Sequence, residues 1–262
     1  MRKPIQPAAT VDSVMRAPEQ INPAVGKLER PDRAWMNDFR INPATTALLV
    51  VDLQYGSTRV DLGYSNIFRF LGFGPMLEAR NEHIHGTLLP NVQQLQAAFR
   101  TAGAPVIFLT VGSSVGDLSD MPPRFRRAAA YCAEHGLPAP WAGLGTREIT
   151  ILDEVKPLPG EAVVVKTGAS GFTGSPLDRV LRSRGIRELV FCGVATTYCV
   201  ESTLRDAADR GFDCVLVEDA SYDLNDDAHQ RGVESCRYFA RVDQTDAVIV
   251  ELSANSGAQP EK

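Results

Sequence analysis

Short aliphatic runs alternate along the chain with longer segments of mixed or helical pattern. Five runs short enough to be buried strands lie at residues 47–51, 105–111, 162–165, 188–194 and 214–217. A short sixth strand is expected at residues 240–242. Strands that alternate with helices pair in parallel through right-handed crossovers. The pattern therefore predicts a single α/β domain with a doubly wound, mostly parallel sheet and helices on both faces.

Helical spacing is clearest at residues 91–101, where Val92, Leu95 and Phe99 fall on one stripe. Three more helices are expected at residues 175–184, from about residue 199 to 211, and at 226–239. The last apolar segment, residues 245–252, fits either a helix or a strand by its pattern alone.

Two internal stretches and both ends of the chain lack this periodicity. Residues 55–89 mix glycines with aromatic residues and are predicted to form short helical pieces over the strand ends, whereas residues 113–150 are predicted to be irregular. Residues 1–43 carry six prolines, which predicts an extended N-terminal arm. The domain then spans residues 44–254, and residues 255–262 form a polar tail.

Composition and charge argue against several classes of function. The formal net charge of -5 and the pI of about 5.5 are not those of a nucleic-acid-binding protein, which would carry a basic patch. No apolar run approaches the roughly 20 residues of a membrane span, and the N-terminus lacks the apolar core of a secretory signal. The cysteines are odd in number and form no C-x-x-C pair, which indicates free thiols in a reducing compartment. We therefore expect a cytoplasmic protein with no membrane or nucleic-acid partner.

Polar residues stand at the carboxyl ends of three predicted strands. Asp52 follows the first strand, Lys166 follows the third, and Cys199 lies one short loop beyond the fourth. The carboxyl ends of parallel strands share one edge of a sheet, so these side chains are expected to meet in one crevice. A lysine directly after three valines has little access to water, which favours a pocket with a carboxylate partner.

A thiol, an ammonium group and a carboxylate in one partly dry site can cleave an acyl bond. The helix start at Cys199 and the charge of Lys166 would lower the pKa of the thiol, and Asp52 would accept its proton and return it to a leaving nitrogen. Simpler roles stay open at this point, with Asp52 as a loop cap and Cys199 as a small buried core residue.

No motif in the sequence indicates a cofactor or a metal ion. The glycine-rich segment 167–175 matches neither the P-loop nor the dinucleotide fingerprint, and no G-x-G-x-x-G follows the first strand, which argues against a nucleotide-dependent oxidoreductase. His83 and His85 stand two positions apart, so they do not share a helix face, and no clear third ligand accompanies them. We therefore expect neither a cofactor nor a metal.

Three motifs resemble those of one known family. They are residues 48–54, Lys166 with Ser170-Gly171-Phe172, and the long segment 193–206. Together they make residues 45–252 similar to the isochorismatase-like cysteine hydrolases, the group that holds N-carbamoylsarcosine amidohydrolase and the ureidoacrylate, biuret and triuret hydrolases. The resemblance implies a six-stranded parallel sheet, Asp52, Lys166 and Cys199 as a catalytic triad, and a helix at residues 245–252.

The resemblance also implies a cis peptide bond between Val194 and Ala195. The N–H groups of Ala195 and Cys199 would then form an oxyanion hole. The implied reaction is hydrolysis of an amide, ureide or carbamoyl C–N bond of a small molecule through a thioester on Cys199, with release of ammonia or an amine. Because the family commonly forms dimers or tetramers, a homo-oligomer is expected.

Substrate contacts are harder to assign from the sequence. Gln54, Phe172 and Tyr198 flank the triad along the chain and are candidate binding residues, although each can equally serve packing. Several arginines are candidate partners for a carboxylate on the substrate, namely Arg59, Arg69, Arg80 and Arg124.

Other members of the family carry different signatures. Isochorismatases lack the nucleophilic cysteine, and nicotinamidases carry an Asp-x-His metal motif after the first strand that does not occur here. Two alternatives stay open. One is another hydrolase of the family, of the N-carbamoylsarcosine amidase, nicotinamidase or isochorismatase type, and the other is a non-catalytic binding protein on the same fold.

Overall fold

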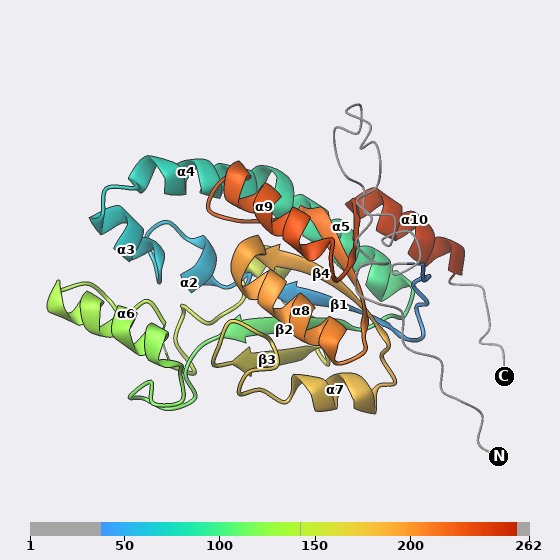
Figure 1. Ribbon diagram of the computed structural model, residues 1–262, viewed down its shortest axis with the longest axis horizontal. Coiled ribbons are helices and arrows are strands. Elements are labelled where there is room, and N and C mark those ends of the chain that lie inside the picture. Colours follow the sequence, from blue (N-terminus) through green and yellow to red (C-terminus); the bar gives the residue numbers. More distant parts are fainter. Residues whose placement is uncertain (1–37, 142, 256–262) are drawn as a thin grey trace, which may run out of the picture. The chain divides into compact units, whose positions relative to one another are not determined.

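The computed structural model describes residues 38–141 and 143–255 (Figure 1). Most of the predicted N-terminal arm, residues 1–37, and residues 256–262 of the predicted tail lie outside the described residues. Ile41, near the end of the predicted arm, is fully buried. Its N–H group donates to the carboxylate of Glu251, and its carbonyl oxygen accepts a hydrogen bond from Asn255, so this part of the chain is fixed to the last helix.

The described residues contain one six-stranded sheet in which every pair of strands is parallel. The strands are β1 (Thr46–Val51), β2 (Val106–Val111), β3 (Ala162–Lys166), β4 (Glu188–Val194), β5 (Asp213–Tyr222) and β6 (Arg241–Asp243). Their order across the sheet is β3-β2-β1-β4-β5-β6. The predicted doubly wound sheet is confirmed. The clearest difference is β5, which continues to Tyr222 instead of ending at residue 217.

Helices connect these strands. In the described part of the chain they are α2 (Tyr55–Thr58), α3 (Ser65–Phe70), α4 (Gly74–His83), α5 (Leu89–Thr101), α6 (Pro123–Glu134), α7 (Leu177–Ser183), α8 (Glu201–Asp209), α9 (Asp226–Cys236) and α10 (Thr245–Asn255). Two π-helical turns, η2 (Ile84–Leu88) and η4 (Thr196–Val200), lead into α5 and α8, and a 3-10 turn, η3 (Asp153–Val155), precedes β3. The ambiguous last segment is thus a helix, as the resemblance implies.

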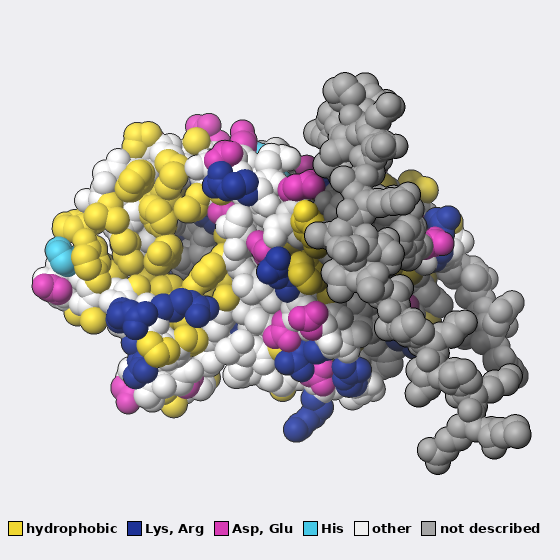
Figure 2. Space-filling view, in the orientation of Figure 1, with side chains coloured by type: hydrophobic (Ala, Val, Ile, Leu, Met, Phe, Trp, Pro, Cys, Tyr) yellow, Lys and Arg dark blue, Asp and Glu magenta, His cyan; other side chains and the backbone are white. Residues whose placement is uncertain are grey.

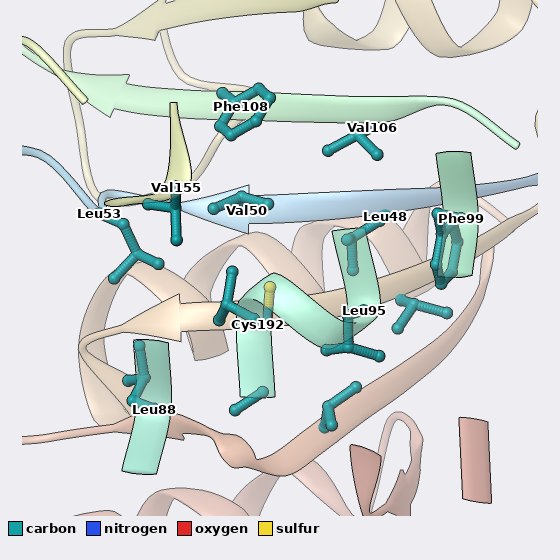
Figure 3. Close-up of a cluster of buried hydrophobic side chains, with 14 of the residues drawn as sticks. Leu48, Val50, Leu53, Leu88, Leu95, Phe99, Val106, Phe108, Val155 and Cys192 are labelled. Carbon is teal, nitrogen blue, oxygen red and sulfur yellow. The ribbon is translucent and has the colours of Figure 1, made fainter. Parts of the chain in front are cut away.

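The sheet is covered on both faces because successive residues of a strand point to opposite sides. Leu48 and Val50 of β1 pack with Leu95 and Phe99 of α5 and with Leu252 of α10 in one core cluster (Figure 3). The intervening residues of β1 pack with α7, α8 and α9 in a second cluster. The strand ends that carry the candidate site are therefore held by a core on each side.

One helix differs from expectation. Residues 113–150, predicted to be irregular, contain α6, which follows Pro122 and has Pro123 at its first position. Only Phe125 and Cys132 of this helix are buried. Its apolar stripe is therefore too narrow to stand out as a period among the arginines and alanines.

The carboxyl end of β4 lies very close to β1. Gly193 has a φ of 119°, and a Cβ atom added to it would stand 2.1 Å from the carbonyl oxygen of Val51. Position 193 therefore cannot carry a side chain unless one backbone moves. This close approach brings the loop after β4 beside Asp52, the residue that follows β1.

We predict that Gly193→Ala lowers the free energy of unfolding by about 3 kcal/mol or more, because the methyl group adds a backbone clash to the strain of a positive φ. Gly211→Ala is the matched control. Gly211 also has a positive φ, of 83°, but nothing lies within 4 Å of an added Cβ, so a loss of only about 1–2 kcal/mol is expected. Urea unfolding measures both values. Equal losses would contradict a tight contact between β4 and β1.

Candidate active site

Three side chains from separate strand ends meet at the carboxyl edge of the sheet. Asp52 follows β1 with a φ of 49°, Lys166 is the last residue of β3, and Cys199 lies in η4 after β4. β3 is two strands away from β1, and neighbouring strands are about 4.8 Å apart. The cation on β3 must therefore span a large part of a gap of roughly 10 Å, which only a long side chain such as lysine can do.

Lys166 is the centre of this group. Its Nζ lies 2.9 Å from Oδ2 of Asp52, 3.4 Å from Sγ of Cys199 and 2.9 Å from the carbonyl oxygen of Gly168. The three side chains are buried, with exposed fractions of 1% for Asp52, 0% for Lys166 and 6% for Cys199. The ammonium group thus faces three acceptors in a site that is closed to bulk water.

Burial and charge shift the pKa values of these groups in opposing ways. Burial raises the pKa of Asp52, although Lys166 acts to lower it. Burial would lower the pKa of Lys166, but the charge of the Asp52 carboxylate and the hydrogen bonds that Lys166 makes in the site outweigh it, so this pKa is raised. Burial also raises the pKa of the Cys199 thiol, and Asp52 adds to the rise. Lys166 acts to lower this pKa, as expected, but burial and Asp52 outweigh it, so the resting site holds a neutral thiol beside an ion pair.

Asp52 and Cys199 open onto a cavity of about 370 Å³. Its walls are mainly apolar and aromatic and include Phe68, Leu77, Phe125 and Trp141. Figure 2 shows hydrophobic side chains gathered around a hollow over α3, α4 and α6. A largely apolar cavity with a few polar groups is typical of a site for a small molecule.

The loop after β4 forms part of the cavity wall. The peptide bond between Val194 and Ala195 is cis, and Ala195 lines the cavity together with Cys199. The N–H group of Ala195 donates to no acceptor among the described residues. It is thus a donor available to an oxygen atom in the cavity.

Contacts from two other elements fix the turn that carries the thiol. Oδ2 of Asp223, directly after β5, accepts hydrogen bonds from the N–H and the hydroxyl group of Thr197 at 2.6 and 2.7 Å. From α9, the ring Nδ1 of His229 lies 2.8 Å from Oγ1 of Thr196. Gly232 of the same helix packs so closely that an added Cβ would stand 2.8 Å from the Thr196 methyl carbon. The turn is therefore held on both sides.

Of the three residues predicted to bind substrate, Tyr198 lines the cavity, and Gln54 and Phe172 do not. The side-chain amide of Gln54 is occupied by the backbone, because it bonds both the N–H and the carbonyl group of Val111. Phe172 stacks on Phe212 and packs against the second core cluster. Neither side chain therefore lines this cavity, since residues next to the triad along the chain can point away from it.

Sequence reasoning does not reveal Asp223 or the aromatic wall. The acidic pair at 218–219 suggests the end of the fifth strand, whereas β5 continues through Ala220, Ser221 and Tyr222. For this reason the sequence does not show that Asp223 lies directly after a strand. Residues 220–222 are buried, and Tyr222 is of a type enriched in strands, which is the one signal that could have extended the predicted strand. The aromatic wall residue Trp141 lies in a stretch without periodicity, which gives no signal.

The described residues show neither a metal-binding cluster nor a membrane-spanning helix. Within residues 38–141 and 143–255, no group of three or more His, Cys, Asp or Glu side chains is arranged to hold a metal ion. His83, one of the two histidines considered as ligands, stacks on Tyr222 with ring centroids 3.7 Å apart. No helix in the described ranges has the length and apolar character needed to cross a membrane.

Known proteins resemble this chain in sequence and in fold. A family model for the isochorismatase domain matches residues 46–247. The chain belongs to the isochorismatase family. It is 36% identical over 199 residues to the ureidoacrylate amidohydrolase RutB of Pseudomonas savastanoi pv. phaseolicola, which covers 74% of this chain and 77% of that protein. It is 33% identical over 222 residues to RutB of Rhizobium rhizogenes, with 82% and 84% covered. The predicted class, a hydrolase of the amidohydrolase kind, is confirmed.

Solved structures in the family agree with the fold. A cysteine hydrolase from Pseudomonas syringae pv. phaseolicola 1448A superposes with a TM-score of 0.67 and 23% identity, covering 83% of this chain and 96% of that one. N-carbamoylsarcosine amidase from Thermoplasma acidophilum superposes with a TM-score of 0.55 and 23% identity, covering 77% and 97%. At these identities, the likeness establishes the fold alone.

We predict that Asp223→Ala lowers kcat/KM by roughly 10- to 100-fold, because the Thr197 N–H and hydroxyl groups lose a charged acceptor that fixes η4. Asp226→Ala is the control, since it removes a hydrogen bond from Tyr222 without touching η4. Steady-state kinetics and thermal unfolding of both variants separate lost activity from lost stability. Full activity in Asp223→Ala would contradict the anchoring role.

Proposed function

We propose that the protein hydrolyses a C–N bond of a small amide or ureide through a covalent thioester on Cys199. The observation that supports this most strongly is the position of Lys166 Nζ, 2.9 Å from the Asp52 carboxylate and 3.4 Å from the Cys199 sulfur, at a cavity of small-molecule size. A thiol and a carboxylate are thus each in contact with the same cation, beside a cavity that can admit a substrate.

In the first step, the sulfur of Cys199 attacks the substrate carbonyl carbon while the thiol proton passes to Asp52. Transfer during the attack avoids a free thiolate, which burial and the Asp52 charge disfavour. The raised pKa of Asp52 makes it a stronger base than an exposed carboxylate. Lys166 keeps its proton and stabilises the negative charge as it moves from Asp52 toward the sulfur.

The carbonyl electrons move onto oxygen as the C–S bond forms. The N–H groups of Ala195 and Cys199 would receive this oxyanion, and a single donor of this kind is typically worth about 2.7–4 kcal/mol. The C–N bond then breaks, and the nitrogen leaves with the proton held by Asp52. Water attacks the thioester and gives its proton to Asp52, and the sulfur leaves and takes that proton back, which restores the resting site.

A non-catalytic binding protein is the less well supported alternative. Replacing a buried ion pair by apolar residues is often neutral or stabilising, so the pair is not explained by stability alone. A binding role gives no reason to keep this ion pair beside a thiol that Lys166 contacts. Hydrolysis requires all three groups.

The substrate class is proposed from the relatives. Two relatives that align with more than two thirds of the chain are named ureidoacrylate amidohydrolases, which supports a small ureide as substrate. A homo-oligomer, a dimer or a tetramer, stays a prediction that rests on the family resemblance. A cytoplasmic location stays a prediction that rests on the free cysteines.

We predict that Cys199→Ala loses activity by about 10⁴-fold or more while it keeps the fold, because the attacking atom is removed. The assay follows ammonia release from ureidoacrylate, N-carbamoylsarcosine, biuret, triuret and nicotinamide. Cys236→Ala, which removes a different buried thiol away from the cavity, serves as the control and retains most activity. Wild-type turnover in Cys199→Ala would exclude the thioester mechanism, and no release from any of the five compounds by the wild type would count against the proposed substrates.

We predict that kcat/KM falls on the acidic side at a pH above the ordinary range of an aspartate, because Asp52 must be ionised and its pKa is raised by burial. Lys166 acts to lower that pKa. In Lys166→Met the acidic limb should therefore move to still higher pH, along with a large loss of rate. Lys156→Met, at an exposed position, is the control. An acidic limb in Lys166→Met that is unmoved or shifted to lower pH would show that Asp52 is not the base.

A further inference from the structure

Arg80 of α4 is a buried cation in the wall of the same cavity. Its exposed fraction is 6%, and it lines the cavity together with Asp52 and Cys199. Its Nε donates to the carbonyl oxygen of Asp223 at 2.9 Å. Burial lowers the pKa of Arg80 to about 10, so the guanidinium stays charged at neutral pH.

The rest of this guanidinium has no partner in the described part of the chain. No carboxylate there lies within 4.0 Å of Arg80, and no hydrogen bond from its two Nη atoms reaches a described residue. Other partly buried arginines are paired, since Arg100 bonds both oxygens of Glu161, and Arg241 bonds Asp243 and Glu251. Arg80 is thus more buried than either and yet lacks an acidic partner.

Asp223 does not supply that partner. Its carboxylate accepts hydrogen bonds from Thr197 and from the N–H group of Leu224, and it presents only its backbone carbonyl to Arg80. Its charge raises the pKa of Arg80 without forming an ion pair. Asp223 therefore connects Arg80 to η4, the turn that carries Cys199, because it bonds both Arg80 and Thr197.

A buried charge is costly unless a counter-charge and hydrogen bonds compensate for it. The planar guanidinium presents parallel N–H groups that match the two oxygens of a carboxylate. Because the free Nη groups belong to a side chain of the cavity wall, the missing anion is best supplied by a ligand in the cavity.

We infer that Arg80 binds a carboxylate of the substrate while the scissile carbonyl of the same molecule lies at Cys199. This inference rests on the proposed function and narrows it to acidic ureides or amides. Arg80 is then the residue that selects acidic over neutral substrates.

The experiment compares ureidoacrylate with its N-methylamide, in which a neutral group replaces the carboxylate, and mass spectrometry identifies the bond that is cleaved. N-carbamoylsarcosine with its own N-methylamide provides a second pair. For each, kcat/KM is measured with the wild type, Arg80→Gln and Arg80→Lys. Arg124→Gln tests the other arginine of the cavity wall, which donates to the hydroxyl group of Tyr198. Arg69→Gln, at an exposed position outside the cavity, is the matched control.

We expect the wild type to prefer the acidic member of a pair, and Arg80→Gln to reduce that preference by roughly 10- to 100-fold, mainly through a higher KM for the acid. Arg80→Lys keeps the positive charge but loses the parallel N–H groups that match a carboxylate, so it should retain part of the preference for the acid. If Arg80→Gln fails to fold, Arg80→Lys carries the test, and a preference equal to that of the wild type overturns the inference.

Two further outcomes separate this inference from the proposed function. Cleavage of biuret, triuret or nicotinamide without cleavage of either acid, or a preference that responds to Arg124→Gln and not to the Arg80 variants, overturns the role of Arg80 and leaves the thioester mechanism standing. Absence of cleavage of all compounds by the wild type overturns the proposed substrates, and the inference with them.

Discussion

The buried ion pair between Lys166 and Asp52 is the constraint on which the rest of the site depends. Each charge removed from water costs several kcal/mol, and only close contact with a partner and further hydrogen bonds offset that loss. Here the offset comes from the 2.9 Å contact and from the carbonyl group of Gly168. The two residues stand on strands separated by β2, so the pair forms only when the sheet has this order. Fold and chemistry are therefore coupled through one contact.

The same pair decides how the thiol behaves. An exposed cysteine near a lysine would have a lowered pKa, but here burial and the Asp52 carboxylate outweigh Lys166 and raise it. The thiol is thus protonated in the resting site, and in the proposed mechanism Asp52 accepts its proton as the sulfur attacks. A precise backbone is needed for this, which the contact of Gly193 with Val51 and the hydrogen bonds from Thr197 to Asp223 provide.

The sequence was sufficient where local pattern and topology determine position. Aliphatic runs locate the strands, and parallel strands bring their carboxyl ends together, so the meeting of Asp52, Lys166 and Cys199 follows from pattern alone. The sequence was insufficient where the direction of a side chain decides whether that residue reaches the site. Gln54 stands two residues after Asp52 but bonds the backbone of β2. Arg80 was one of four equivalent candidates, because neither its burial nor its place in the cavity wall can be read from an aperiodic segment.

Some charged groups around the cavity have partners of opposite charge and others do not. This difference would orient a charged molecule that binds there. Asp52 is neutralised by Lys166, and Asp223 by hydrogen bonds from Thr197 and Leu224. Arg80 and Arg124 have no acidic partner in the described chain, and of the two only Arg80 is buried. In an apolar cavity the effective dielectric constant is lower than at a surface, so an uncompensated charge there discriminates more strongly between ligands. One buried cation without an acidic partner beside Asp52, Lys166 and Cys199 therefore supports our inference of a substrate with an anionic end, and the same charge would orient the other end of that molecule toward the sulfur.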